Sequence, residues 1–474
     1  MTFASLARRL AFVCVLLPVL AHAAPRSVPV LLLSDIHFDP YRDPAKFPQL
    51  MTSPVERWPE IFAAPVSATQ VSDYSKLSQA CSVKGTDADW PLLQSALHAA
   101  HDREAHPAFI TLSGDLSVHH FECQFHRLAP KGTPAELSAF AAKVVGFVTG
   151  EIRHTFPGTP VFLTLGNNDS GCEDYGEDID SAYLQADGAV VAEAALTKAD
   201  AARVRHEYGP EGDYAVPLPR PFAHTRLLVL QDIFQSAKYR PCSGASPKHA
   251  GAEAQLAWLR HELHQARARH EGVWLMAHIP PGVDVYSTTV GKRDVCGGDA
   301  PVNFLGDNSM AELLAEYAST VKLALFAHTH MDEMRLFRSP DGKAAAPAKL
   351  VPSISAANGN RPVFMLGWAD PETGTLVDYS MVVAADNSGS AWHETYRYST
   401  TYHQPDFSGA SVSRLMDKLT AGSVESTSYR TFYSAGDSGI RALALGLAWK
   451  QYACSLTHSS AAEYRACSCG GAKK

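Results

Sequence analysis

The sequence predicts an α/β protein built around a largely parallel sheet, because buried strands and helices alternate along it. Continuous apolar runs, which are typical of strands covered on both faces, occupy 28–33, 109–112 and 161–165. Helices are predicted between these runs, at 89–104 and from 133 to about 152. Alternation of this kind indicates βαβ units, in which helices cover a parallel sheet.

Capping residues mark the beginnings of these two helices. Asp89 is a typical N-cap, Pro91 fits the first turn, and the apolar residues that follow share one helical face. Thr133 and Glu136 have the spacing of a capping box, in which each side chain satisfies a backbone N–H group at the helix start. Both helices therefore carry local start signals.

The middle of the chain continues the alternation. Strands are predicted at 226–230, 273–276 and 321–326, with an amphipathic helix at 252–269. The polar, alanine-rich stretch 180–207 is interpreted as a helical insertion.

Beyond residue 330 the pattern becomes that of alternating strands. They are predicted at 333–337, 363–368 and 376–383. From about Trp392 the sequence becomes helical and aromatic, and this last segment holds three cysteines. The chain therefore ends in a region of different character from its α/β part.

The first 23 residues have the features of a signal peptide. Arg8 and Arg9 supply positive charge, 10–20 is an apolar stretch of 11 residues, and 21–23 reads Ala-His-Ala. Eleven apolar residues are too few to cross a bilayer, and no later stretch is long enough. We therefore expect cleavage near Ala23 and a secreted or periplasmic product without a transmembrane segment.

These patterns divide the chain into a signal peptide at 1–23, a main domain at 24–390 and a helical, cysteine-containing region at 391–474. The formal net charge of −8 argues against binding of nucleic-acid duplexes, which requires a basic surface. The sequence leaves the oligomeric state open.

Residues that can bind metals follow five of the predicted strands. They are Asp35, His37, Asp115, Asn167, His278, His328 and His330. Because the carboxyl ends of parallel strands meet at one edge of a sheet, we expect these side chains to converge. Carboxylate, amide oxygen and imidazole are ligands for divalent ions such as zinc, manganese and iron.

Each segment alone also has an ordinary structural explanation. Asp35-x-His37 after a strand is more often a turn cap. His328-x-His330 is a stronger signal, because alternation along an extended strand would put both rings on one side of the backbone, although a hydrogen-bonded histidine pair explains it equally well. Their joint occurrence, in order and each after a strand, favours two ions that share the central Asp115. Two neighbouring ions clamp a phosphate, so the pattern indicates phosphoryl transfer.

The eight cysteines outside the signal peptide indicate disulfides. The chain has nine cysteines, and Cys14 lies in the signal peptide. An even number in an exported protein predicts that most or all are paired, although eight allow 105 pairings. We expect Cys454 to bond to Cys467 or Cys469, and Cys123 and Cys172 to staple loops near the ligand segments.

The ligand segments resemble the calcineurin-like metallophosphoesterase superfamily, and within it the acid sphingomyelinase and sphingomyelinase-like phosphodiesterase family. The similarity rests on Asp-Ile-His-Phe-Asp-Pro at 35–40, Gly-Asp at 114–115, His-Ile-Pro-Pro-Gly at 278–282, His-Thr-His-Met-Asp-Glu at 328–333 and Pro-Ser-Ile-Ser at 352–355. It implies a four-layer α/β/β/α sandwich as the catalytic domain, followed by a helical C-terminal region.

The resemblance also implies two divalent ions that share Asp115, with zinc preferred and manganese or iron as alternatives. The first ion would also take Asp35, His37 and His330. The second ion would also take Asn167, His278 and His328.

Two further residues carry the proton chemistry that the resemblance implies. A histidine that faces the phosphate in the family falls on His119, which is otherwise a loop histidine beside His120. Where the superfamily usually has Gly-Asn-His, this chain has Asn168, which can hydrogen-bond a phosphate oxygen but delivers no proton at ordinary pH. The Gly-Asn-Asn-Asp sequence at 166–169 also resembles the endopolyphosphatase branch.

The implied reaction is hydrolysis of a phosphodiester or phosphoanhydride by a hydroxide that bridges the ions. We expect a small, soluble, nucleotide-like substrate, because the net charge is negative and no lipid-binding domain fits before Asp35. The aromatic segment 392–419 is expected to pack onto the catalytic domain. The alternatives are a sphingomyelin phosphodiesterase, an endopolyphosphatase or acid phosphatase, and a metal-binding protein without activity.

Overall fold

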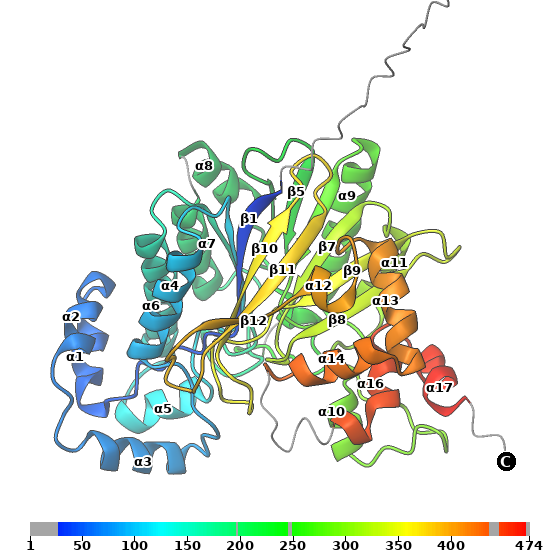
Figure 1. The fold of residues 1–474 in the computed structure, drawn as a ribbon. Coiled ribbons are helices and arrows are strands. Elements are labelled where there is room, and N and C mark those ends of the chain that lie inside the picture. Colours follow the sequence, from blue (N-terminus) through cyan, green and yellow to red (C-terminus); the bar gives the residue numbers. More distant parts are fainter. Residues whose placement is uncertain (1–26, 196–197, 245–248, 436–444, 471–474) are drawn as a thin grey trace, which may run out of the picture.

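The computed structural model describes residues 27–195, 198–244, 249–435 and 445–470, and Figure 1 shows their arrangement. The predicted signal peptide at 1–23 lies outside these residues. Within the described ranges, no helix is long and apolar enough to cross a membrane.

Two six-stranded sheets form the centre of the molecule. The first has the order β12 (His393–Arg397), β11 (Leu376–Val383), β10 (Val363–Ala369), β1 (Val28–Leu33), β2 (Ile110–Ser113) and β3 (Val161–Thr164). The second has the order β4 (Tyr214–Pro217), β5 (Thr225–Val229), β6 (Gly272–Met276), β7 (Val321–Phe326), β9 (Ala345–Leu350) and β8 (Glu333–Arg338).

Each sheet has a parallel part and an antiparallel part. Strands β1, β2 and β3 are parallel to one another, as are β5, β6, β7 and β9. Strands β10, β11 and β12 are joined in antiparallel pairs, and β10 pairs with β1 in the middle of the first sheet. The parallel core is therefore confirmed, although both sheets are mixed.

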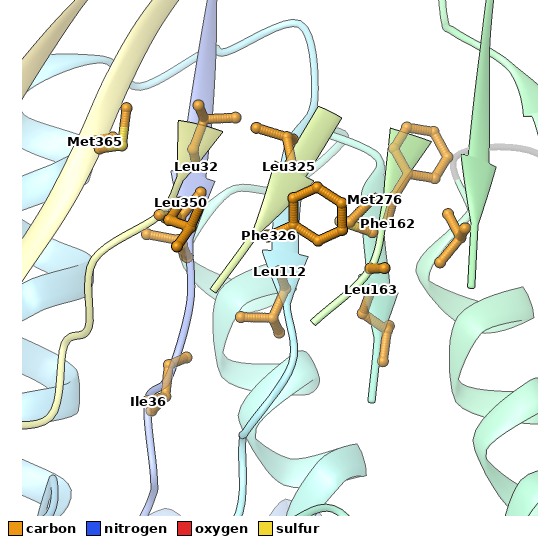
Figure 2. Packing of buried hydrophobic residues seen from close by; sticks show 14 of the residues in the cluster. Leu32, Ile36, Leu112, Phe162, Leu163, Met276, Leu325, Phe326, Leu350 and Met365 are labelled. Atoms are coloured by element: carbon orange, nitrogen blue, oxygen red, sulfur yellow. The ribbon is translucent and has the colours of Figure 1, made fainter. Parts of the chain in front are cut away.

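Apolar side chains fill the space between the two sheets. Figure 2 shows Leu32 and Leu112 from the first sheet close to Met276 and Phe326 from the second, and all four are fully buried. These strands are covered on both faces, which is why apolar residues dominate them in the sequence.

Helices cover the outer face of each sheet (Figure 1). The first sheet carries α4 (Trp90–Arg103), α6 (Pro134–Thr155) and α7 (Ala182–Ala194). The second carries α9 (Ala250–Ala268), α11 (Ser309–Glu316) and α13 (Gly409–Ala421). The layers are helix, sheet, sheet, helix, so the four-layer α/β/β/α prediction is confirmed.

The remaining helices lie in loops and in the C-terminal region. They are α1 (Phe47–Thr52), α2 (Trp58–Ala63), α3 (Gln70–Ala80), α5 (Phe121–Leu128), α8 (Lys198–Glu207), α10 (Val285–Val290), α12 (Tyr398–Tyr402), α14 (Val424–Phe432), α16 (Trp449–Ser455) and α17 (Ala461–Cys469). The helical insertion predicted at 180–207 is thus two helices, α7 and α8. The predicted helical C-terminal region is present from Tyr398 onward.

The predicted helix starts form as expected. The carboxylate of Asp89 accepts the N–H group of Leu92 at 3.1 Å. Thr133 accepts the N–H group of Glu136, and Glu136 accepts that of Thr133, which completes the capping box of α6.

Three strands were missed by sequence reasoning. The segment of β9 is rich in alanine and contains Pro347, both of which are uncommon in strands. Strand β12 lies where a helix was predicted from Trp392 onward, and it extends the first sheet as an edge strand. β4 is a short edge strand that pairs only with β5. Pairing with neighbouring strands, rather than local sequence preference, accounts for these three strands. The division of the chain into domains at residue 391 stays a prediction.

All eight cysteines in the described residues are paired, as predicted. The bonds are Cys81–Cys123, Cys172–Cys242, Cys296–Cys469 and Cys454–Cys467. The expected bond within the tail forms between Cys454 and Cys467, whereas Cys469 bonds outside the tail to Cys296. Such bonds persist in oxidising compartments.

A buried acid near the Cys172–Cys242 bond makes stability depend on pH. Burial raises the pKa of Glu177 from 4.5 to about 8, although hydrogen bonds from Ser181 and from the N–H group of Asp178 oppose the shift. The folded chain therefore favours the protonated side chain. Its contribution to stability is complete below pH 4.5 and is lost as the pH rises towards 8.

We expect Glu177→Gln to remove this dependence while keeping an oxygen that accepts the two hydrogen bonds. The unfolding temperature of the variant should rise relative to the unchanged protein as the pH increases from about 5 to 8. Thermal unfolding of both proteins at several pH values in that interval measures this. A difference that stays constant with pH would contradict the assignment.

Candidate dimetal site

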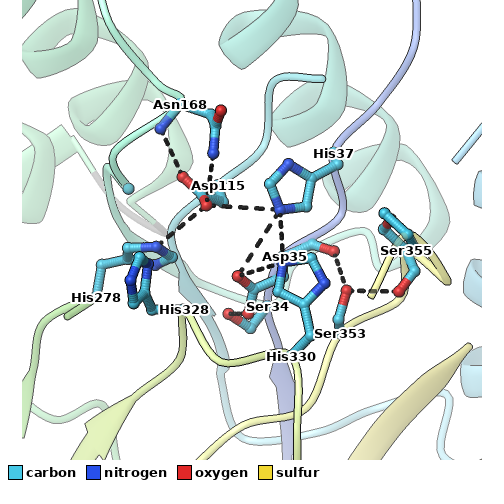
Figure 3. Close-up of polar contacts among 12 residues, drawn as sticks. Ser34, Asp35, His37, Asp115, Asn168, His278, His328, His330, Ser353 and Ser355 are labelled. Carbon is cyan, nitrogen blue, oxygen red and sulfur yellow. Dashed lines mark hydrogen bonds and ion pairs between the residues drawn. The ribbon is translucent and has the colours of Figure 1, made fainter. Parts of the chain in front are cut away.

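The seven predicted ligand residues lie together at the carboxyl ends of the parallel strands, as Figure 3 shows for six of them. Asp35 and His37 follow β1, Asp115 follows β2 and Asn167 follows β3. The three histidines come from the second sheet, after β6 and β7. The site therefore bridges the two sheets at one edge of the sandwich.

One group of ligands surrounds the carboxylate of Asp35. Its Oδ1 lies 3.8 Å from Nε2 of His37 and 3.6 Å from Nε2 of His330. The two Nε2 atoms are 3.0 Å apart. Nε2 of His37 is also 3.5 Å from Oδ2 of Asp115.

A second group lies on the other side of Asp115. Its Oδ2 is 3.2 Å from Nε2 of His278. The amide oxygen of Asn167 lies 3.3 Å from Nε2 of His278 and 2.8 Å from Nδ1 of His328. Oδ2 of Asp115 thus contacts a histidine of each group, which is the position of a bridging carboxylate.

Five of these residues have left-handed backbone conformations. The φ angles are 44° at Asp35, 46° at His37, 55° at Asp115, 71° at His328 and 65° at His330. Such conformations are uncommon outside glycine and cluster at functional sites. His328 and His330 therefore lie on a turn after β7, which corrects the expectation that strand alternation orients their rings.

Two glycines let the ligand loops approach one another. A Cβ atom on Gly166 would lie 2.2 Å from Oδ1 of Asp115. One on Gly114, whose φ is +89°, would lie 2.7 Å from Nδ1 of His278. Any side chain at either position would displace a ligand, so the close packing of loops here requires glycine.

Hydrogen bonds to main-chain carbonyl oxygens orient two of the ligand rings. Nδ1 of His37 lies 3.0 Å from the carbonyl oxygen of Ser117, and Nδ1 of His278 lies 2.8 Å from that of Ser113. A carbonyl accepts a proton only, so each ring carries its proton on Nδ1 and turns Nε2 towards Asp115. Each ring can therefore bind a metal through Nε2 once that nitrogen has lost its proton.

Outer carboxylates hold the ligand loops, and sequence reasoning missed them. Asp169 accepts N–H groups of Gly166, Leu116 and Ser117. Asp232 accepts N–H groups of His278 and Ile279. Asp232 closely follows β5, so the strand-end pattern that revealed the ligands was also present there.

The side chain of Asn167 is oriented by a third carboxylate. Its Nδ2 donates to Asp174 at 2.8 Å, so its Oδ1 faces His278 and His328. Amide oxygen, rather than nitrogen, is the atom that binds a divalent ion. Asp174 therefore presents Asn167 as a ligand.

The pKa values of the four histidines are shifted by burial and by the charges of neighbouring ligands. Although burial lowers the pKa of His37 and His278, the neighbouring carboxylates, Asp115 foremost and Asp35 with it, together outweigh burial and raise these values to about 9 and about 10. Burial lowers the pKa of His328 to about 3, helped by repulsion from His278, and that of His330 well below its usual value, helped by repulsion from His37. His37 and His278 are therefore protonated beside the Asp115 carboxylate. A bound ion would replace these protons.

The donor set fits divalent ions. Oδ1 of Asp35 and Nδ1 of His330 are buried and have no hydrogen-bond partner among the described residues. Buried polar atoms without partners are rare, and a metal ion bound by Oδ1 of Asp35 would supply the partner that this oxygen lacks.

His119 lies at the rim of the first ligand group. Its ring stacks on that of His37, with centroids 3.9 Å apart, and its side chain is 26% exposed. Nδ1 lies 2.9 Å from a carboxylate oxygen of Asp87, which in turn accepts the hydroxyl of Ser355. Asp87 thus orients the ring and leaves Nε2 for other contacts.

Asn168 contacts Asp115. Its backbone N–H group donates to Oδ1 at 2.8 Å, and its side-chain Nδ2 donates to Oδ2 at 3.0 Å. These bonds hold the shared carboxylate in place (Figure 3). A direct contact between Asn168 and a substrate phosphate stays a prediction.

Two groups of buried carboxylate and imidazole ligands that share one aspartate define a dimetal phosphoesterase. The chain belongs to the calcineurin-like phosphoesterase family, whose model matches residues 28–332. It is therefore a metallophosphoesterase, and the substrate that the family implies is a phosphoester.

Its distant relatives over most of the chain are acid sphingomyelinase-like phosphodiesterases. It is 24% identical over 406 residues to acid sphingomyelinase-like phosphodiesterase 3b of Mus musculus, covering 82% of this chain and 78% of that protein. It is 22% identical over 191 residues to a cyclic GMP-AMP phosphodiesterase of Rattus norvegicus, covering 38% and 40%. A dimetal phosphatase structure from Danio rerio superposes with a TM-score of 0.42 at 11% identity, over 81% of this chain and 100% of that one.

Proposed function

We propose that the protein is an exported phosphodiesterase that uses two zinc ions to hydrolyse a small, soluble, nucleotide-like phosphodiester or phosphoanhydride. The observation that carries the proposal is the position of Asp115, 3.5 Å from His37 on one side and 3.2 Å from His278 on the other. Bound there, two ions would polarise the phosphoryl oxygens and lower the pKa of water towards about 7.

The protein's own residues supply positioning and a proton. Asp169 and Asn168 hold the ligand loops and Asp115, so the ligands are placed before any ion binds. His119, oriented by Asp87, faces the site from its rim and is placed to protonate the leaving oxygen. The amide of Asn168 has no acidic proton, so we assign this role to His119.

The aromatic residues of segment 392–419 support a soluble substrate. A lipid-binding surface exposes aromatic side chains to the membrane. Here Tyr396, Tyr398, Tyr402 and Phe407 are all buried. Trp392 packs against Phe364 and donates to Ser95. These side chains therefore pack the C-terminal region onto the sandwich, as expected from the sequence.

Export is supported by the four disulfides together with the signal-peptide pattern of the sequence. The names of relatives point to more than one substrate: sphingomyelin occurs in the name of a phosphodiesterase of Caenorhabditis elegans and cyclic GMP-AMP in that of the rat protein. Substrate choice in this chain therefore has to be measured.

The test is a substrate panel with mature protein whose metal content has been determined. It contains bis(p-nitrophenyl) phosphate, nucleotides, inorganic polyphosphate and sphingomyelin in vesicles. We expect two ions per chain and the highest kcat/KM on the soluble diesters or nucleotides. A preference for vesicle sphingomyelin without detergent would overturn the substrate assignment, and absence of hydrolysis with two ions bound would overturn the enzymatic one.

A further inference from the structure

His328 faces its ligand group through a different ring atom from the other three histidines. His37, His278 and His330 each turn Nε2 towards a ligand carboxylate. In His328 the nitrogen next to the amide oxygen of Asn167 is Nδ1, at 2.8 Å, so Nε2 faces away from the ligands. An ion bound through Nδ1 requires the ring proton to be on Nε2. The group that contacts Nε2 therefore sets the tautomer of His328.

That group is the hydroxyl of Tyr175, whose oxygen lies 3.4 Å from Nε2 of His328. The two rings meet edge to face, with centroids 6.2 Å apart and planes at 82°. A hydroxyl oxygen can accept the Nε2 proton, as binding through Nδ1 requires. His37 and His278 are oriented by main-chain carbonyl oxygens, which no side-chain substitution removes. The partner of His328 is a side chain, so its contribution can be measured.

The backbone of Tyr175 is held in a conformation that bulky residues rarely adopt. Its φ is 61°, in the left-handed region. Its N–H group donates to the carbonyl oxygen of Asn167 at 3.0 Å, and its own carbonyl oxygen accepts the N–H group of Arg240 at 3.0 Å. Such conformations persist only where the surrounding structure imposes them, and they cluster at functional sites. Here they place the ring beside His328.

The loop that carries Tyr175 orients two ligands of the same group. The Cys172–Cys242 disulfide ties this loop, which follows β3, to the segment that follows β5. Asp174, the neighbour of Tyr175, accepts the side-chain amide of Asn167. One stapled loop thus orients Asn167 through a carboxylate and the next ligand, His328, through a hydroxyl.

Lys238, from the segment that follows β5, holds the hydroxyl of Tyr175. Its Nζ lies 3.3 Å from the hydroxyl oxygen and 4.8 Å from the ring centroid. An ammonium group only donates, so it uses one lone pair of the oxygen and leaves the other for Nε2 of His328. Lys238 therefore supports the contact between Tyr175 and His328 through the hydroxyl.

We propose that Tyr175 is a positioning residue for the second ion: its hydroxyl accepts the Nε2 proton of His328, and Lys238 holds that hydroxyl in place. The inference rests on the two ions of the proposed function and adds a role for a residue that is not a ligand. Loss of a partner of this kind costs about 10–100-fold in metal affinity. The loss should fall on the second ion, because His328 belongs to its ligand group.

Tyr175→Phe tests this, since it removes the hydroxyl and keeps the ring. Zinc content per chain is measured after equilibration of the mature protein at a series of free zinc concentrations. We expect the affinity for one ion to fall by about 10–100-fold and the affinity for the other to stay unchanged. Turnover of bis(p-nitrophenyl) phosphate should return to its usual kcat at saturating zinc, because Tyr175 orients a ligand and does not touch the reacting atoms.

A double variant shows which ion is affected. Asp35→Asn weakens the first ligand group alone, because Asp35 contacts His37 and His330. At a zinc concentration where the single variants each hold one ion, the double variant Asp35→Asn with Tyr175→Phe should hold none. A double variant that still holds one ion would mean that both substitutions act on the first ion, which would overturn the inference.

Tyr239→Phe is the matched control, because it removes a buried tyrosine hydroxyl from the same pair of loops. The hydroxyl of Tyr239 donates to the carbonyl oxygen of Glu177 at 3.0 Å rather than contacting a ligand. Both zinc affinities should stay unchanged in this variant. Lys238→Met, which keeps the aliphatic stem and removes the donor, should weaken the second ion less than Tyr175→Phe does.

The remaining outcomes separate this inference from the proposed function. Unchanged zinc affinities in Tyr175→Phe, or an equal loss in Tyr239→Phe, would overturn the role of the hydroxyl. A kcat that stays low at saturating zinc would make Tyr175 a catalytic residue instead of a positioning one. Because zinc binding is measured apart from hydrolysis, a protein that binds two ions and hydrolyses nothing would contradict the proposed function alone.

Discussion

Asp115→Asn will remove both metal ions together and reduce turnover by more than about 10²-fold. Loss of a partner outside the ligand shell already costs about 10–100-fold in metal affinity or activity, and Asp115 is within reach of both ligand groups. Asn keeps the shape and accepts the hydrogen bonds of Asn168 through one oxygen only. Metal analysis of the purified variant and kcat on bis(p-nitrophenyl) phosphate measure the effect.

Asp35→Asn is the matched comparison, because Asp35 contacts only His37 and His330 of the first group. We expect this variant to lose one ion and keep the other. Asp341→Asn, in an exposed loop, should change neither metal content nor turnover. Full metal content and activity in Asp115→Asn would refute the shared-carboxylate geometry.

His119→Ala should reduce kcat by about 10²–10⁴-fold on substrates with poor leaving groups, and leave both ions bound. His119 is held by Asp87 and stacks on His37, so it is placed to give a proton to the departing oxygen. An alkoxide needs that proton and p-nitrophenolate does not. The loss should therefore be much smaller with a p-nitrophenyl ester than with an alkyl ester or a dinucleotide.

Two other variants separate this role from a structural one. His120→Asn changes the neighbouring exposed histidine, whose φ of 56° Asn tolerates, and should leave kcat unchanged. Asp87→Asn should lower kcat less than His119→Ala and with the same dependence on the leaving group. A loss that is equal for good and poor leaving groups, or that accompanies loss of an ion, would show that His119 positions or binds metal instead.

The ligands were predictable because each closely follows a buried parallel strand. An apolar run ends in the sequence where the strand ends in space, so Asp35, Asp115 and Asn167 could be placed at one edge without knowing the fold. Among the outer carboxylates, Asp169 and Asp232 also follow strand ends, but Asp87 was not predictable in the same way. Asp87 lies in a loop far from any strand end, and its contact with His119 depends on how that loop folds over the site.

Local sequence also failed where tertiary pairing decides the structure. β9 forms from alanine and proline residues because β7 and β8 lie on either side of it. The predicted bond from Cys454 left one tail cysteine without a predicted partner. Cys469 bonds to Cys296, in the loop that follows α10, where Arg465 of α17 also donates to the carbonyl oxygens of Gly298 and Asp299. No short-range pattern reports such contacts.

The position of β1 sets the order in which the site is completed during synthesis. β1 lies between β2 and β10, so the first strand made waits for one of the last, Val363–Ala369, before both of its edges are paired. The carbonyl oxygen of Asp35 likewise accepts the hydroxyl of Ser353, 318 positions further along. A chain that is still being synthesised therefore presents Asp35 and His37 on an unfinished sheet. It follows that the sheet edge that carries Asp35 and His37 can be completed only after the segment up to Ala369 has been made.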